Sequence, residues 1–144
     1  MSTFVLDNSV AMRWLLASKK KADQGYAEAV LQRLDEDEAL VPNLWHLEAA
    51  NVLLGAEKSG ELELGEVERF IAQLECLPIA VDSLTSNQAF SRGLNLSRAY
   101  NLSSYDAAYL ELALREGLPL ATLDKNLIIS TMKTVVPLYL NLTE

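Results

Sequence analysis

The chain has 144 residues, half of them hydrophobic, and a formal net charge of −8. This length suits one domain with a sizeable core, so we expect a single domain over residues 1–144. The acidic balance argues against a protein that binds nucleic acid through overall positive charge, although it leaves room for an enzyme that holds a cation between itself and a polyanion. One cysteine and one histidine exclude an internal disulfide and give no cluster for zinc.

The sequence shows no membrane or secretion signal. Its apolar runs are short and broken by charges, so we expect no transmembrane segment. The N-terminal stretch has no basic start, and Asp7 and Arg13 interrupt its apolar residues, so we expect no signal peptide. We therefore expect a cytoplasmic protein.

Short apolar runs alternate with longer stretches of helical periodicity. Apolar runs without polar alternation are typical of strands covered on both faces, as in parallel sheets. The predicted strands are residues 3–6, 39–41, 79–81, 118–123 and 135–138. The predicted helices are residues 9–17, 22–35, 43–58, 64–76, 83–99 and 104–116. Strands that alternate with helices form βαβ units, so we expect an α/β fold, a three-layer α/β/α sandwich with a central parallel sheet.

Two acidic residues end predicted strands. Asp7 follows the first strand in "FVLDNSV", and Asp124 ends the fourth in "LPLATLDKNL". The carboxyl ends of parallel strands line the ligand crevice of an open sheet, so both acids are well placed for chemistry. Capping of a helix or turn is the alternative for each. For Asp7 this alternative is weaker, because Ser9 is available to cap the next helix.

Two further acids lie on or beside apolar helix faces. Glu48 in "NLWHLEAANVLL" shares its side of the helix with Val52 rather than with the solvent-facing residues. A buried carboxylate needs a partner, which Arg13 could supply structurally and a metal ion functionally. Asp106 in "LSSYDAAYLELAL" either forms a capping box with Ser103 or points toward the interior.

Four acids at one edge of a sheet would repel one another. At a separation of about 5 Å and an effective dielectric near 20, each pair of carboxylates repels by roughly 3 kcal/mol. Helix dipoles offset only about 0.3–1 kcal/mol each. Either the acids take up protons or a divalent cation lies between them, and an all-oxygen set of ligands favours Mg²⁺ or Mn²⁺ over zinc.

Four segments, taken in order, resemble a known family. "FVLDNSV", "LWHLEAANVLL", "LSSYDAAYLELA" and "ATLDKNL" together make the chain similar to PIN-domain ribonucleases, and specifically to the compact VapC-type toxins of toxin–antitoxin pairs. The resemblance implies a PIN-like sheet of strand order 3-2-1-4-5. It also implies a Mg²⁺-dependent endoribonuclease that hydrolyses RNA phosphodiesters, with catalysis and metal binding at Asp7, Glu48, Asp106 and Asp124.

The resemblance also assigns supporting roles. Ser9 is expected to position a water molecule and Asn51 to orient the acidic ligands. Asn126 stands where related proteins often have another acid, and an amide there leaves a second metal ion in doubt. Capping or structural hydrogen bonds are the alternative for all three. The candidates for contact with RNA phosphates are Arg13, Lys125 and the run Lys19, Lys20 and Lys21.

The same resemblance implies two protein partners, a second copy of the chain in a homodimer and an inhibitory antitoxin. The antitoxin is expected to cover the acidic pocket, where a basic side chain could take the place of the metal ion.

Other interpretations compete with this one. Asp82 in "PIAVDSLT" also ends a predicted strand, but the expected strand order places it roughly 10 Å from Asp7, so we expect it to cap the next helix. The chain could instead be a PIN-fold binding module without catalytic activity, although such a module has no need of four repelling acids. A receiver-type or phosphatase-type domain would need a second acid close to Asp7, where the sequence has Asp-Asn-Ser.

Overall fold

The computed structural model of the chain describes residues 2–141, and within them the fold is built on a parallel sheet. Its strands pair in the order β3-β2-β1-β4, so β1 lies between β2 and β4. The strands of this sheet are β1 (Thr3–Leu6), β2 (Glu38–Val41), β3 (Ile79–Val81) and β4 (Leu120–Ala121).

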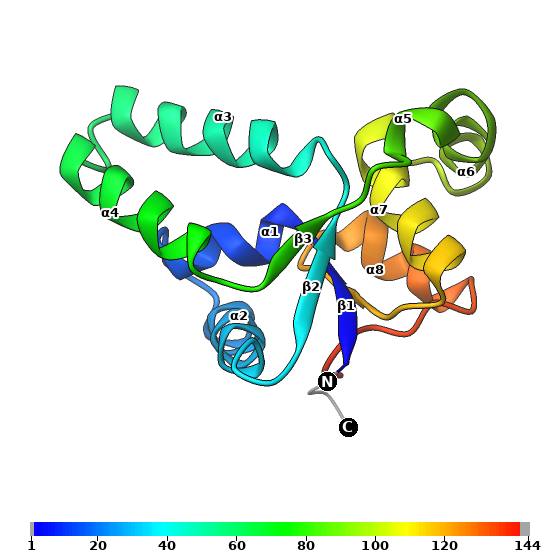
Figure 1. The fold of residues 1–144 in the computed structure, drawn as a ribbon, viewed down its shortest axis with the longest axis horizontal. Coiled ribbons are helices and arrows are strands. Elements are labelled where there is room, and N and C mark those ends of the chain that lie inside the picture. Colours follow the sequence, from blue (N-terminus) through cyan, green and yellow to red (C-terminus); the bar gives the residue numbers. More distant parts are fainter. Residues whose placement is uncertain (1, 142–144) are drawn as a thin grey trace.

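Helices cover both faces of the sheet, which confirms the three-layer sandwich (Figure 1). One layer contains α1 (Asn8–Ala11), the 3-10 turn η1 (Met12–Trp14), α2 (Lys21–Arg33), α3 (Trp45–Lys58) and α4 (Leu64–Glu75). The other layer contains α5 (Thr85–Gln88), the π-helical segment η2 (Ala89–Gly93), α6 (Leu94–Tyr100), α7 (Ser104–Glu116) and α8 (Lys125–Met132). The described helices include none that is long and apolar enough to cross a membrane.

The core explains why the strands are continuous apolar runs. Phe4, Val5 and Leu6 of β1 are each 0% exposed, because helices pack on both faces of this central strand. Tyr139, near the end of the chain, stacks on Phe4 with ring centroids 3.9 Å apart. The hydroxyl of Tyr139 donates to Asp37 Oδ2 at 2.6 Å and closes the amino-terminal edge of the sheet. This leaves the opposite, carboxyl-terminal edge for function.

The last two predicted strands are shorter than expected. Strand 118–123 is reduced to β4, and predicted strand 135–138 is reduced to one parallel bridge between Leu120 and Leu138. The bridge still occupies the expected fifth position, beside β4. Pro119 and Pro137 have no N–H group, so neither residue can donate to a continuous ladder.

The predicted helices are found, with three differences. Helix 9–17 starts at Asn8 and tightens into η1 after one turn. Helix 83–99 starts at Thr85 and contains η2, where a Cβ on Gly93 would lie 3.2 Å from the carbonyl oxygen of Gln88. Helix α8 was not predicted, because eight residues give too little periodicity to distinguish a helix from a loop.

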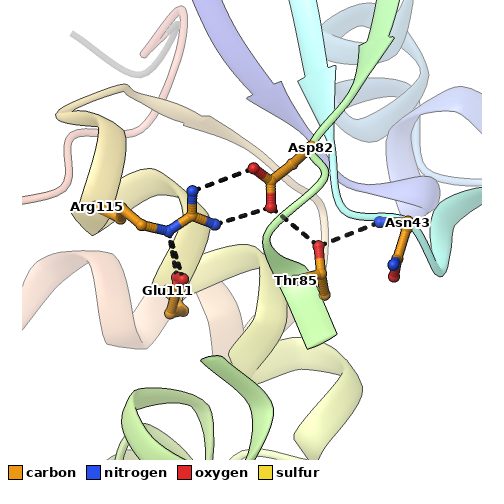
Figure 2. A network of polar contacts seen from close by, with 5 residues as sticks. All are labelled: Asn43, Asp82, Thr85, Glu111 and Arg115. Atoms are coloured by element: carbon orange, nitrogen blue, oxygen red, sulfur yellow. Dashed lines mark hydrogen bonds and ion pairs between the residues drawn. The ribbon is translucent and has the colours of Figure 1, made fainter. Parts of the chain in front are cut away.

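Asp82 does not cap α5, as the sequence suggested, because Leu84 takes the N-cap position. Instead, Arg115 from α7 donates to both carboxylate oxygens of Asp82, at 3.1 and 2.8 Å (Figure 2). Arg115 also donates through Nε to Glu111, at 2.7 Å to the nearer oxygen. Burial alone would raise the pKa of Asp82, but hydrogen bonds from Arg115 and Thr85 bring it below its ordinary value. Asp82 therefore joins β3 to α7 through an ion pair.

Candidate active site

The four predicted acids all lie at helix N-termini on the carboxyl-terminal edge of the sheet. Asp7 and Asp124 occupy the N-cap positions of α1 and α8. Glu48 and Asp106 lie in the first turns of α3 and α7. A helix N-terminus favours negative charge by about 0.3–1 kcal/mol, so the fold supplies a weak positive potential to each acid.

Asp7 is 5% exposed and is held by two hydroxyl groups. Its Oδ2 accepts hydrogen bonds from Ser9 Oγ at 2.6 Å and from Thr122 Oγ1 at 2.7 Å. The main-chain N–H groups of Leu123 and Asp124 donate to those same hydroxyls, at 3.0 Å each, so the hydroxyl protons are left to point at Asp7. Neither Ser9 nor Asp7 caps α1 with its side chain. Ser9 lies inside the helix, and the Asp7 carboxylate accepts no hydrogen bond from the N–H groups of its first turn.

Glu48 is half-buried and is held by a tyrosine. The hydroxyl of Tyr109, a residue with 0% exposure, donates a short hydrogen bond to Glu48 Oε1. The structural alternative for Glu48, a bond to Arg13, is wrong. Among residues 2–141 the ion pairs are Arg33–Asp37, Arg115–Asp82 and Arg115–Glu111. The described part of the chain therefore supplies no cation to any of the four acids.

Asp106 and Asp124 both take part in helix capping. Ser103 Oγ accepts from the main-chain N–H of Asp106 at 3.0 Å, which is one half of the predicted capping box. Asp124 Oδ1 accepts from the main-chain N–H of Leu127 at 3.0 Å and so caps α8. Both carboxylates are half-buried. Capping fixes these acids without neutralising them.

The acids perturb one another's protonation. Burial raises the pKa of Asp7 to about 6, against the lowering effect of its two hydroxyl donors, and the charges of Glu48 and Asp124 raise it further. Burial also raises the pKa of Asp106 to about 6, with added repulsion from Asp124 and Asp7. For Glu48, burial and the charge of Asp106 raise the pKa despite the Tyr109 hydrogen bond. The fold therefore gathers negative charge that it does not balance.

Comparison with known proteins identifies the family. The sequence pattern of the PIN domain family matches residues 4–130, nearly the whole chain. The chain belongs to the PIN domain family. No curated protein matches it.

Solved structures share the fold of this PIN domain. The protein PAE2754 from Pyrobaculum aerophilum aligns with a TM-score of 0.64 at 20% identity, over 90% of this chain and 86% of that one. A toxin–antitoxin complex from Klebsiella pneumoniae gives 0.59 at 18% identity, over 84% and 86%. VapBC2 from Rickettsia felis, bound to a DNA fragment from its promoter, gives 0.61 at 10% identity, over 96% and 98%. At these identities the likeness shows the fold.

The four acids of this PIN domain offer only carboxylate oxygens, the type of ligand that a hard divalent cation prefers. These carboxylates stand at positions where they repel one another, and no thiolate or imidazole is among them. Within residues 2–141, however, no three acidic, histidine or cysteine side chains stand close enough together to form a ready-made metal site. Neighbouring carboxylates are near enough to raise the pKa of Asp7, Glu48 and Asp106, and the four acids would have to draw closer to surround an ion.

Of the other predicted residues, only Ser9 has a hydrogen bond to one of the acids within residues 2–141, and the rest differ in exposure. Ser9 donates to Asp7 and so belongs to the site. Arg13, on η1, is half-buried. The remaining candidates are exposed, on α3 (Asn51), on the first turn of α8 (Lys125, Asn126) and around the start of α2 (Lys19, Lys20, Lys21).

Sequence reasoning missed two residues of the site, Thr122 and Tyr109. Thr122 is a polar residue in an otherwise apolar segment, two residues before Asp124, and that interruption was a usable signal. Tyr109 lies one turn after Asp106, so it shares that side of α7, but its ring made it look like an ordinary core residue.

We predict that replacing Asp7 changes how stability depends on pH. Between the ordinary value of 3.8 and about 6, folded Asp7 keeps a proton that the unfolded chain releases, so the protein loses stability as pH rises through this window. Asp7→Asn should therefore raise the free energy of unfolding by about 3 kcal/mol at neutral pH and above, and the gain should vanish below the ordinary value. Urea unfolding in chelator across this pH range measures the effect. The exposed control Glu68→Gln should show no such pH dependence, and an Asp7→Asn gain independent of pH would contradict the account.

We also predict strong coupling between Tyr109 and Glu48. In a double-mutant cycle of Tyr109→Phe and Glu48→Ala, unfolding free energies should give a coupling of about 1.5–3 kcal/mol, as expected of a hydrogen bond to a charged group. The Tyr139–Asp37 pair is a matched control, because it is also a tyrosine hydroxyl donating to a carboxylate, at the other edge of the sheet. Additivity at Tyr109 and Glu48, with coupling retained in the control, would show that the hydrogen bond is not formed in solution.

Proposed function

We propose that this PIN domain is a divalent-metal-dependent endoribonuclease and the toxin of a toxin–antitoxin pair. The observation that supports the proposal best is the arrangement of Asp7, Glu48, Asp106 and Asp124. They lie at four helix N-termini of one sheet edge and receive no cation from residues 2–141, and burial and the charges of neighbouring acids raise the pKa of Asp7, Glu48 and Asp106. Such a site favours an ion from solution.

In this proposal the four carboxylates hold Mg²⁺ or Mn²⁺. When bound, the ion supplies positive charge that activates water and neutralises charge developing on the scissile phosphate. Two sets of hydroxyl donors orient the acids. Ser9 and Thr122 fix one oxygen of Asp7 and leave Oδ1 available, and Tyr109 fixes one oxygen of Glu48. Because these hydrogen bonds already restrict Asp7 and Glu48, the two side chains lose less conformational entropy when the acids draw together around the ion.

The proposed substrate must meet positive charge on an otherwise acidic protein. Lys125 follows Asp124 directly and is exposed on the first turn of α8, so it can contact a phosphate next to the cleaved bond. Arg13 is the second candidate, on η1 in the segment that follows Asp7. Asn51 and Asn126 remain candidates for orienting water or ligands at the rim.

Partners follow from the same proposal. The similar structures from Klebsiella pneumoniae and Rickettsia felis are a toxin–antitoxin complex and a VapBC complex, which supports an antitoxin as a partner of this chain. A basic side chain of that antitoxin would be attracted to the unbalanced acids and would exclude the metal ion. We also propose that the chain forms a homodimer.

We predict that the purified protein cleaves single-stranded RNA with Mg²⁺ and not with excess chelator. Asp7→Asn should lower the rate by about a hundredfold or more, because it removes a ligand from the reacting site. Gel analysis of a labelled RNA pool measures this rate. Glu66→Gln is the matched control, since Glu66 also lies in the first turn of a helix, α4, and it should keep full activity. Cleavage that persists in chelator or in Asp7→Asn would contradict the proposal, and no cleavage at all would favour a binding module.

A further inference from the structure

A cavity lies at the carboxyl-terminal edge of the sheet, and none of the four acids lines it. It has a volume of about 220 Å³ and lies between the start of α7, the segment α5–η2 and the loop that precedes α3. Pockets for drug-sized ligands measure about 300–1,000 Å³, so this one suits a single ring system. Tyr105 lines it and is the neighbour of Asp106 in the chain. The cavity therefore adjoins the first turn of α7, the turn that also carries Asp106.

Three of the lining residues, Asn43, Thr85 and Glu111, belong to a polar network that also contains Asp82 and Arg115 (Figure 2). Thr85 Oγ1 donates to Asp82 at 3.1 Å and accepts from the main-chain N–H of Asn43 at 3.3 Å. Asp82 and Glu111 are held by Arg115, and they are 7% and 4% exposed. These contacts join the loops after β2 and β3 to α7. The buried ion pairs of Arg115 with Asp82 and Glu111 therefore hold the elements around the pocket together.

The charge of this network, which reaches the cavity through Glu111, bears on which group the cavity can take. The Arg115 guanidinium is committed through Nε and both terminal nitrogens to two carboxylates, so it offers no free cation to a phosphate. Two carboxylates and one guanidinium leave the network with a net negative charge. A phosphate would be repelled there, whereas a neutral polar ring would be accepted.

The walls of the cavity offer what such a ring needs. Tyr105 is 64% exposed, so its ring can stack on a planar ligand. Four lining side chains carry amide or hydroxyl groups that make no hydrogen bond within residues 2–141, namely Asn43, Ser86, Gln88 and Ser104. Amides can both donate to and accept from the edge of a base. The adjoining wall is the π-helical segment η2, a type of irregularity frequently found at functional sites.

We propose that this cavity, which we term the Tyr105 pocket, binds one base of a single-stranded RNA next to the cleaved phosphate. The proposal rests on the proposed nuclease function and adds a source of sequence preference to it. The base stacks on Tyr105, and Asn43 and Gln88 contact its edge. The lining is mostly apolar, so an apolar side chain of a protein partner is the competing occupant; the unpaired amide and hydroxyl groups can hydrogen-bond a base and not such a side chain.

Binding of short RNAs to the Asp7→Asn protein in Mg²⁺ tests the pocket without cleavage. Fluorescence anisotropy should show that at least one of the four homopolymers binds about 10-fold or more tightly than an abasic chain of equal length. Tyr105→Ala should reduce that preference to less than about twofold, and Tyr105→Phe should keep it. Phe90→Ala is the matched control, because Phe90 is 94% exposed on the neighbouring segment η2 but does not line the pocket. Equal thermal midpoints confirm that the variants fold.

The outcomes separate this proposal from the nuclease function. A base preference that survives Tyr105→Ala, or that Phe90→Ala removes equally, overturns the Tyr105 pocket even if wild-type protein cleaves RNA. A preference that depends on Tyr105, in a protein that cleaves no RNA with Mg²⁺, supports the pocket and defeats the nuclease function. If Tyr105→Ala weakens only the binding of a protein partner, the competing occupant is correct.

Discussion

The rest of the structure depends on the repulsion among four carboxylates at one edge of a parallel sheet. The strand order brings the ends of β1 and β4 side by side, and the crossover helices α3 and α7 begin at that same edge. Each acid therefore gains some support from a helix dipole. That support is small compared with the cost of burial, since the pKa of both Asp7 and Asp106 still rises to about 6. The fold places the charges without balancing them.

The acids of the candidate site are held by neutral hydrogen-bond donors, whereas acids with a purely structural role are paired with cations. Asp82 shows the structural solution in the same molecule, because Arg115 binds it and brings its pKa below its ordinary value against the effect of burial; Asp37 likewise has an arginine partner, Arg33, although the Tyr139 hydroxyl lowers its pKa most. Asp7 and Glu48 receive only hydroxyl groups, from Ser9, Thr122 and Tyr109. Hydroxyl donors orient a carboxylate and leave its charge in place, so an incoming ion still finds a full negative charge. This difference separates the proposed catalytic acids from the structural ones.

The sequence predicted those features that depend on local pattern. Continuous apolar runs identified β1, β2 and β3, and acids after strands and on apolar helix faces identified the candidate site. Features that depend on tertiary contact were missed or wrong. Asp82 looked like a helix cap because its partner Arg115 is remote in the chain, and Tyr109 looked apolar because its hydroxyl matters only beside Glu48. The pocket at Tyr105 needs three separate segments, which no local pattern can join.

Diffraction from crystals grown with Mn²⁺ tests the central claim most directly, because the anomalous signal locates the ion without assumptions about activity. We predict a manganese peak among the side-chain oxygens of Asp7, Glu48, Asp106 and Asp124, with Asp7 still accepting hydrogen bonds from Ser9 and Thr122. A site that stays empty at saturating Mn²⁺, or that contains a lysine or arginine of the same chain between the carboxylates, would contradict it.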